Sequence, residues 1–593
     1  MRKGLWVTRL VVQVFLFGCF VVCAPGPTAA VDASFMNLDE IRPGMKGKAK
    51  SVFLGSRIEE FDVEILGVLR NWRPGGDLIL ARASGPQVDN AGIAAGMSGT
   101  PVYVEGKLIG AMAYTWAFSK EPIVGVTPIK EMLGLETAGI GSGSAQPRSR
   151  NDLSSGDWEI PAGTMKAIET PLLVSGFHPA VLRVIEQEAS GLNMVVAQTG
   201  GAGGSVEGDT LVPGAAMAAQ FVRGDGVVAA IGTVTYTEGA RVLGFGHGLM
   251  LGNLAGIPMS TAYVHTVLPS LAGSVKLASP LRMVGKITGE SLSGVLGEIG
   301  SVPSLVPVGV VVKTGTGGER TFHFDVVKNK LLTGMLVGWS ATSAALTLCG
   351  AVGDMTIKAA GEIEFVDKHG ATHEVEYENV LFTTDPASAI SKMVSAPVET
   401  LLNNQFEEAD VRRIDCTLLV RREQRVASIE EVSVRPEEVM PGDSIRVTVK
   451  LKPFRGEVFL RRFSLVVPLT CEAERARILV CSAPEMRVWE EQSTNRRLPP
   501  ANLEQLMSQI ESSGRGDRLE CVLSARSEEA GIEGKPFPSP PSSFSSVLDS
   551  STRSGALTET PLGILGAVAS DTDYALEGRR SVSLKIKHQK AGR

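Results

Sequence analysis

The chain has 593 residues, a length that predicts about three or four domains with buried cores. Its formal net charge of −6 is spread along the sequence, so nothing indicates a nucleic-acid partner. Hydrophobic residues make up 44%, aromatic residues only 5%, and glycine occurs 66 times, a composition that favours a mainly β fold with few short helices over a helical bundle.

Residues 1–30 predict a signal peptide. Three basic residues come first, an apolar run over 10–24 follows, and three small residues at 28–30 suit a cleavage site. The run is shorter than the roughly 20 apolar residues that a membrane-spanning helix needs. We therefore expect an exported protein that is periplasmic, in the cell envelope or secreted. Membrane association through a retained N-terminal segment is the alternative.

Residues 31–138 predict a compact β unit. Apolar and polar residues alternate between residues 45 and 69, as they do in half-buried strands. Two further strands over 102–111 are joined by a tight Glu-Gly turn, and a short helix near residues 128–135 closes the unit.

This unit contains the hexapeptide Gly96-Met97-Ser98-Gly99-Thr100-Pro101, which has the form that a serine nucleophile on a tight turn requires. Gly96 allows the backbone to turn so that its own N–H and that of Ser98 point at one spot, which would form an oxyanion hole. Gly99 leaves room for a substrate carbonyl, and Pro101 directs the chain into a strand. Taken alone, the hexapeptide is equally typical of a Gly-Ser-Gly hairpin turn.

A second β unit is predicted over residues 161–385, after a polar, glycine-rich linker at 139–160. One of its strands, 241–245, runs into Gly246-His247-Gly248. A histidine between two glycines at a strand end is open to close approach by another segment, which suits a general base. An ordinary loop histidine would look the same.

The last third of the chain predicts further β structure. Helical periodicity assigns 386–410 as a connector, and strict alternation at 445–451 indicates an Ig-like β-sandwich over 411–485. Residues 486–593 hold a short helix, a Pro/Ser-rich segment and a final strand.

Cysteine and histidine spacing predicts neither a metal site nor a bound cofactor. No Cys/His cluster has the spacing of a zinc site, and the glycine-rich run over 200–208 lacks the Gly-Lys-Ser/Thr of a phosphate-binding loop. Five cysteines follow the signal, and an oxidising compartment would permit a bridge such as Cys471 to Cys481. The sequence does not fix their pairing.

The hexapeptide and Gly246-His247-Gly248 together resemble the SpoIVB-type serine peptidases, the family of the stage IV sporulation protein B. The first motif is similar to that family's Gly-Met-Ser-Gly-Ser-Pro, with Thr100 in place of a serine. The stretches 106–111, 231–235 and 243–248 are similar too. The resemblance covers residues 35–136 and about 211–310.

This resemblance implies a chymotrypsin-like serine endopeptidase built from two β units. Ser98 would attack the scissile carbonyl, His247 would take its proton, and the N–H groups of Gly96 and Ser98 would hold the oxyanion. The partner would be a protein or peptide substrate, and self-cleavage is one form that the activity could take.

Two departures from the family pattern bear on this expectation. The family's histidine motif precedes its serine motif, whereas Ser98 here precedes His247; a triad is defined by geometry and roles, so this order is acceptable. The position expected for the acidic residue falls at 83–84, where this chain has no carboxylate. The candidate acid is Asp89, and the alternatives for orienting the histidine are Asp77, Asp225 and Ser84.

A different class of function stays open on the same residues. Without an acidic partner the chain would be a slower Ser-His dyad or a catalytically inactive relative. Since a β-sandwich is a module often used for binding, the alternative is a peptidase-like envelope or adhesion protein without enzymatic activity.

Overall fold

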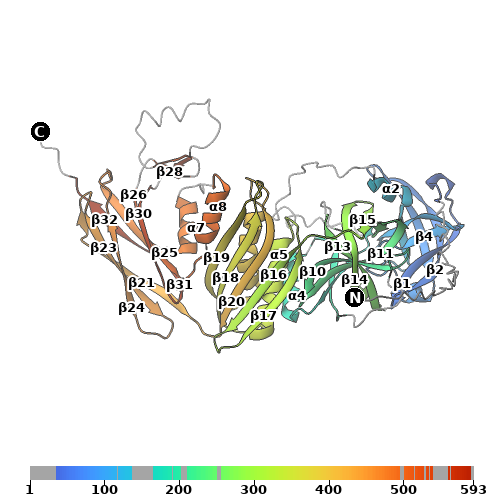
Figure 1. Ribbon diagram of the computed structural model, residues 1–593, viewed down its shortest axis with the longest axis horizontal. Coiled ribbons are helices and arrows are strands. Elements are labelled where there is room, and N and C mark those ends of the chain that lie inside the picture. Colours follow the sequence, from blue (N-terminus) through green and yellow to red (C-terminus); the bar gives the residue numbers. More distant parts are fainter. Residues whose placement is uncertain are drawn as a thin grey trace, which may run out of the picture.

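The computed structural model describes residues 35–116, 118–136, 165–189, 191–201, 210–249, 255–493, 500–512, 514–525, 529–532, 535–537, 558–560 and 563–588. The predicted signal peptide, the linker at 139–160 and most of the Pro/Ser-rich segment lie outside these residues. Strands dominate, which confirms the mainly β fold. Figure 1 shows an elongated molecule with the first β unit at one end and the C-terminal sandwich at the other.

The first unit is a closed cycle of six antiparallel strands. The order β4-β1-β2-β3-β6-β5 is closed by pairing of β5 with β4. Alternate residues of these strands, such as Phe61, Val63 and Ile65 of β2, fill the interior, as the period-2 pattern predicts. The bounds are β1 (Lys46–Leu54), β2 (Arg57–Arg73), β3 (Gly76–Ser84), β4 (Pro101–Val104), β5 (Lys107–Thr115) and β6 (Ile123–Pro128).

Short helices flank this first barrel. The 3-10 turn η1 (Leu38–Glu40) precedes β1, and α1 (Pro86–Ala91) connects β3 to the serine hexapeptide. The helix α2 (Ile129–Leu133) follows β6, where a closing helix was predicted, and the 3-10 turn η2 (Gly134–Glu136) comes directly after it. Because α1 has only six residues, the chain from the end of β3 to the hexapeptide is short.

The second unit contains another closed cycle of six antiparallel strands. Here the order β10-β13-β14-β15-β12-β11 is closed by pairing of β11 with β10. The strands β8 and β9 extend the sheet beyond β11. The bounds are β8 (Thr170–Ser175), β9 (Met194–Gln198), β10 (Ala216–Gly224), β11 (Val227–Glu238), β12 (Arg241–Gly244), β13 (Ile257–Leu268), β14 (Val275–Ser291) and β15 (Gly294–Ile299).

A five-stranded extension continues the same sheet from β10 toward the sandwich (Figure 1). Its strands are β16 (Leu305–Thr314), β17 (Glu319–Val327), β18 (Met355–Val366), β19 (Thr372–Thr383) and β20 (Asp410–Arg421). The helices α5 (Thr333–Cys349) and α6 (Pro386–Leu402) pack on the extension and on each other. The helix α4 (Pro179–Glu188) packs on β9 and on both of these helices.

Two helices of this extension, α5 and α6, are longer than any other helix in the described residues. The helix α5 has 17 residues and was not predicted, because it is buried on nearly every side and therefore shows no amphipathic period. The segment 386–410 is also more than a connector, since α6 packs closely along α5. In the part of the chain that the structure describes, no helix is both long and apolar enough to cross a membrane.

The C-terminal β-sandwich is present, but its predicted limits of 411 and 485 are wrong. At the N-terminal limit, β20 pairs with β16 and belongs to the second unit. Beyond the predicted C-terminal limit, the segment 486–593 supplies the strands β26, β30, β31 and β32 to the sandwich. The two sheets of the sandwich have the strand orders β24-β23-β21-β31 and β22-β32-β25-β26-β30. Single-strand patterns cannot show which sheet a strand joins, because pairing is a long-range choice.

The remaining elements complete this region. The sandwich strands are β21 (Val426–Arg435), β22 (Glu438–Val439), β23 (Ser444–Pro453), β24 (Phe459–Val466), β25 (Arg475–Ser482), β26 (Arg518–Ala525), β30 (Gly563–Asp571), β31 (Ala575–Glu577) and β32 (Arg580–Ile586). The helix α7 (Ala483–Ser493) packs on β25 and β26, whereas α8 (Leu503–Ser512) packs on β19 and α6 of the second unit. The strands β27 (Glu529–Ile532), β28 (Lys535–Phe537) and β29 (Thr558–Thr560) form a small separate sheet. The five described cysteines are buried free thiols, so Cys471 and Cys481 are not bridged.

Gly99 fixes how the two barrels meet. It has φ +92°, and a Cβ at this position would overlap the Thr233 carbonyl oxygen and the Phe245 backbone nitrogen. The Thr233 N–H donates to the Ser98 carbonyl at 2.9 Å, and the Thr235 hydroxyl donates to the Gly99 carbonyl at 2.7 Å. The serine turn of the first barrel is thus hydrogen-bonded directly to β11 of the second.

Replacing Gly99 with alanine should therefore destabilise the protein by about 3 kcal/mol, because it adds both an unfavourable positive φ and a steric overlap with backbone. Gly106→Ala is the matched control, since Gly106 has φ +78° but open space around it. We expect it to cost only about 1 kcal/mol. Scanning calorimetry measures both, and equal losses for the two variants would contradict the close docking of the barrels.

Candidate active site

Ser98 lies on the turn between α1 and β4, at the edge of β5. Gly96 and Gly99 on either side of it have φ +89° and +92°, as a tight turn requires. The Gly99 N–H donates to the Met112 carbonyl of β5 at 2.8 Å. The Ser98 side chain is fully buried, and its Oγ has no hydrogen-bond partner among the described residues.

His247 comes from the second barrel and reaches the same strand. It follows β12 after two residues with positive φ, Phe245 (+63°) and Gly246 (+66°), which turn the chain toward β5. A Cβ at Gly246 would lie 3.1 Å from the Met112 carbonyl oxygen, the atom that accepts the Gly99 N–H. The structure therefore brings the two sequence motifs together at the centre of the junction between the barrels.

The histidine ring is held as a neutral base. Its Nδ1 lies 2.9 Å from the Gly248 carbonyl oxygen, and because a carbonyl only accepts, this bond assigns the proton to Nδ1 and leaves a lone pair on Nε2. Burial lowers the pKa of His247 below 6.5, and this effect is opposed by the backbone carbonyls of Gly248 and Ile168, which favour the charged ring. Nε2 is buried and has no hydrogen-bond partner within the described ranges.

The candidate acid Asp89 has a different place. Its Oδ1 accepts the Gly85 N–H at 3.2 Å at the start of α1, so the carboxylate caps that short helix. It is not among the groups that shift the pKa of His247. The expected Asp-His pairing is therefore corrected: a backbone carbonyl takes the position on Nδ1 that a carboxylate would occupy.

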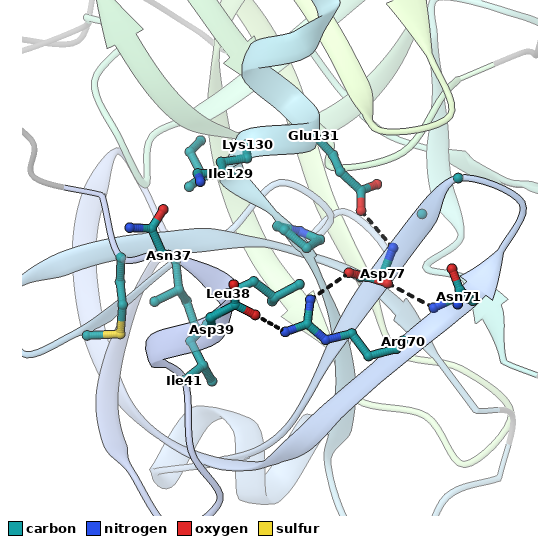
Figure 2. Close-up of a pocket in the computed structure, with 15 residues that line it drawn as sticks. Asn37, Leu38, Asp39, Ile41, Arg70, Asn71, Asp77, Ile129, Lys130 and Glu131 are labelled. Carbon is teal, nitrogen blue, oxygen red and sulfur yellow. Dashed lines mark hydrogen bonds and ion pairs between the residues drawn. The ribbon is translucent and has the colours of Figure 1, made fainter.

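The alternatives to Asp89 are also engaged elsewhere or exposed. Asp77 accepts from the Arg70 side chain at 3.0 Å and from the Asn71 N–H at 2.8 Å, as Figure 2 shows. Asp225 accepts the His323 N–H at 2.8 Å, and Ser84 is an exposed residue at the end of β3. None of the three contributes to the pKa of His247.

Glu290 on β14 is a residue that the sequence analysis missed. Its Oε2 accepts the Leu249 N–H at 2.8 Å, and it would lie 3.7 Å from a Cβ at Gly248. The carboxylate thus holds the loop that carries His247 through the backbone rather than through the ring. A glutamate in a long bulged strand gives no local signal of this role, because only the closure of the barrel brings it to the loop.

Lys276, also on β14, is the second residue that was missed. It is fully buried, its Nζ donates to Ser51 Oγ at 2.8 Å and to Thr233 Oγ1 at 3.5 Å, and its side chain packs against Gly96. Among the described residues no charged group contributes to its pKa shift, which comes from burial alone. Burial lowers its pKa from 10.5 to about 7, so an easily neutralised amine lies beside the serine turn.

Comparison with known proteins adds no relative: no family model, no curated protein and no solved structure matches the chain. The resemblance to the SpoIVB-type peptidases accordingly stays a prediction. What the site can do rests on its own geometry.

The buried lysine predicts a pH-dependent stability. Between about pH 7 and 10.5 the unfolded chain binds the Lys276 proton and the folded chain does not, so the free energy of unfolding should rise with pH, by about 1.4 kcal/mol per pH unit. Lys276→Met removes this group and should flatten the slope. Denaturant titrations of both proteins between pH 7 and 8.5 measure how the free energy of unfolding changes with pH. Equal changes in the two proteins would show that the pKa of Lys276 is not lowered in the folded chain.

Proposed function

We propose that the protein is a serine endopeptidase with Ser98 as nucleophile and His247 as general base. The observation that carries this proposal is that the two motifs meet at one barrel junction, where Ser98 Oγ and His247 Nε2 are both buried. Among the described residues the two atoms are hydrogen-bonded neither to each other nor to any other group. An unpaired buried polar group costs about 1–3 kcal/mol, so such groups usually find partners. Two of them, of complementary chemistry and on motifs whose backbones meet, favour a reactive role over a packing role.

The chemistry follows from the protonation state of the ring. His247 is neutral and carries its lone pair on Nε2, so it can accept the Ser98 proton as Oγ attacks a peptide carbonyl. The resulting imidazolium then protonates the leaving amine, and water hydrolyses the acyl-enzyme by the reverse sequence of proton transfers. The N–H groups of Gly96 and Ser98 are the candidate donors to the oxyanion.

The Gly248 carbonyl can replace part of what an acidic residue does. It selects the correct tautomer and orients the ring, but it carries no full charge to stabilise the imidazolium. We therefore propose a Ser-His dyad that is slower than a full triad. The arrangement of two six-stranded barrels around the site and the resemblance to the SpoIVB-type peptidases support the same assignment. Residues 1–30 support export, and the substrate class is protein or peptide.

Labelling with a serine-directed phosphonate tests the proposal. Ser98→Ala should abolish labelling of the chain from residue 31 onward, and His247→Ala should slow it by about 10²-fold or more, because the proton acceptor is lost. Ser260→Ala is the matched control, since Ser260 is equally buried and its Oγ is likewise unpaired among the described residues, but it lies within β13. It should label like wild type. Labelling that survives in Ser98→Ala would overturn the assignment.

A second candidate is a binding protein on an inactive peptidase scaffold. The burial of Ser98 Oγ and His247 Nε2 favours this candidate, because both atoms are withdrawn from solvent. The lack, among the described residues, of a carboxylate that acts on His247 favours it too. Absence of labelling in every variant, with each protein folded by circular dichroism, would favour this candidate over the peptidase.

A further inference from the structure

The chain passes from the first barrel to the second directly beside the candidate site. The short strand β7 (Lys166–Ala167) pairs antiparallel with the end of β5, in the register Tyr114 to Ala167 and Thr115 to Lys166. At Thr170 the chain is already in β8 of the second sheet. Residues 166–169, called here the crossing segment, therefore bridge the two units at the serine turn.

The crossing segment continues a single row of partners along one edge of β5. β4 pairs with the first part of this edge, up to Ala111, and the serine turn takes Met112 through the Gly99 N–H. The Ile168 N–H donates to the next carbonyl, that of Ala113, at 2.8 Å. The strand β7 pairs with the last part of this edge, at Tyr114 and Thr115. The segment thus begins on β5 where the nucleophile turn ends.

Its backbone also contacts both halves of the candidate machinery. The Gly96 N–H, one of the two expected oxyanion donors, donates to the Glu169 carbonyl at 3.2 Å. The Ile168 carbonyl, with that of Gly248, opposes the lowering of the His247 pKa by burial. A peptide substrate needs the same three features: an extended backbone added to a strand edge, a carbonyl at the oxyanion donor, and closeness to the base.

We propose that the crossing segment occupies the peptide-binding site, so that the chain's own residues 166–169 stand where a substrate binds. This inference rests on the proposed peptidase function. It offers a reason for the burial of Ser98 Oγ and His247 Nε2, since the crossing segment is hydrogen-bonded to β5 directly after Met112 and to the Gly96 N–H of the serine turn. Activity then requires the segment to leave β5.

The side chain of Ile168 indicates the class of peptide that fits. It is 1% exposed and packs in the core of the first barrel with Met97 and Met112, whereas Lys166 and Glu169 on either side of it are exposed. A substrate in this register would place an aliphatic side chain in the Ile168 pocket. A charged side chain there would be excluded, because it would lose its hydration without gaining a partner.

An open cavity lies along the crossing segment. It is lined by the end of α1, by residues 115, 116 and 118–122, by the segment itself and by residues 270–274. Two large apolar side chains at its rim, Phe118 and Leu271, are 84% and 100% exposed. This cavity gives the flanking residues of an extended peptide a surface on which to lie when it replaces the crossing segment.

The experiment measures the rate of phosphonate labelling in the chain from residue 31 onward. Ile168→Ala removes apolar packing that holds the crossing segment on β5. It should raise the labelling rate by about tenfold or more over wild type, because the state in which the segment has left β5 becomes more populated. Ile168→Val keeps most of the packing and should give an intermediate rate. Lys166→Ala, which removes an exposed side chain from the same strand, should label at the wild-type rate.

A peptide added in solution supplies the complementary readout. The octapeptide Gly-Thr-Met-Lys-Ala-Ile-Glu-Thr, copied from residues 163–170, should slow labelling of the Ile168→Ala protein again, and the same peptide with aspartate in place of isoleucine should not. Equal rates in all variants together with no protection by the peptide would overturn this inference while leaving the peptidase proposal intact. If the peptidase proposal itself is wrong, Ser98 will not be labelled in any of these proteins.

Discussion

The docking of the serine turn onto β11 is the interaction on which the rest of the site depends. A glycine at position 99 lets the backbone of the turn lie against Thr233 and Phe245 without an intervening side chain. Gly99, next to Ser98, and Gly246, next to His247, both lie at the same carbonyl of β5, that of Met112. Without this docking the two motifs would stay on separate units, and neither would have a chemical partner.

Water exclusion at this junction explains the electrostatics of the site. Burial disfavours charge on both His247 and Lys276, and among the described residues no carboxylate contributes to the pKa of either group. Polar atoms that gain no partner reduce the stability of the folded chain. The junction thus combines a neutral base, an unpaired hydroxyl and a backbone N–H that already holds a peptide carbonyl, that of Glu169.

Local patterns were sufficient for the β units and for the two motifs, because strand alternation and glycine-bounded turns are short-range signals. They failed where the structure depends on distant pairing: β20 looked like a sandwich strand, and the uniformly apolar α5 has no periodicity to read. Glu290, Lys276 and Ile168 could not be identified from the sequence, since each reaches the site only through barrel closure or chain crossing. Asp89 was chosen for its closeness in sequence, but its carboxylate is used locally by Gly85.

The protonation state of His247 is the most direct test of the account. The chain has seven histidines, and imidazole ¹⁵N spectra of the wild-type and His247→Ala proteins would identify the resonances of this ring. The account predicts a neutral ring at pH 7 with the proton on Nδ1, titrating below 6.5. A ring protonated on Nε2, or one that titrates above 6.5, would contradict it, because Nε2 could then not accept the proton of Ser98.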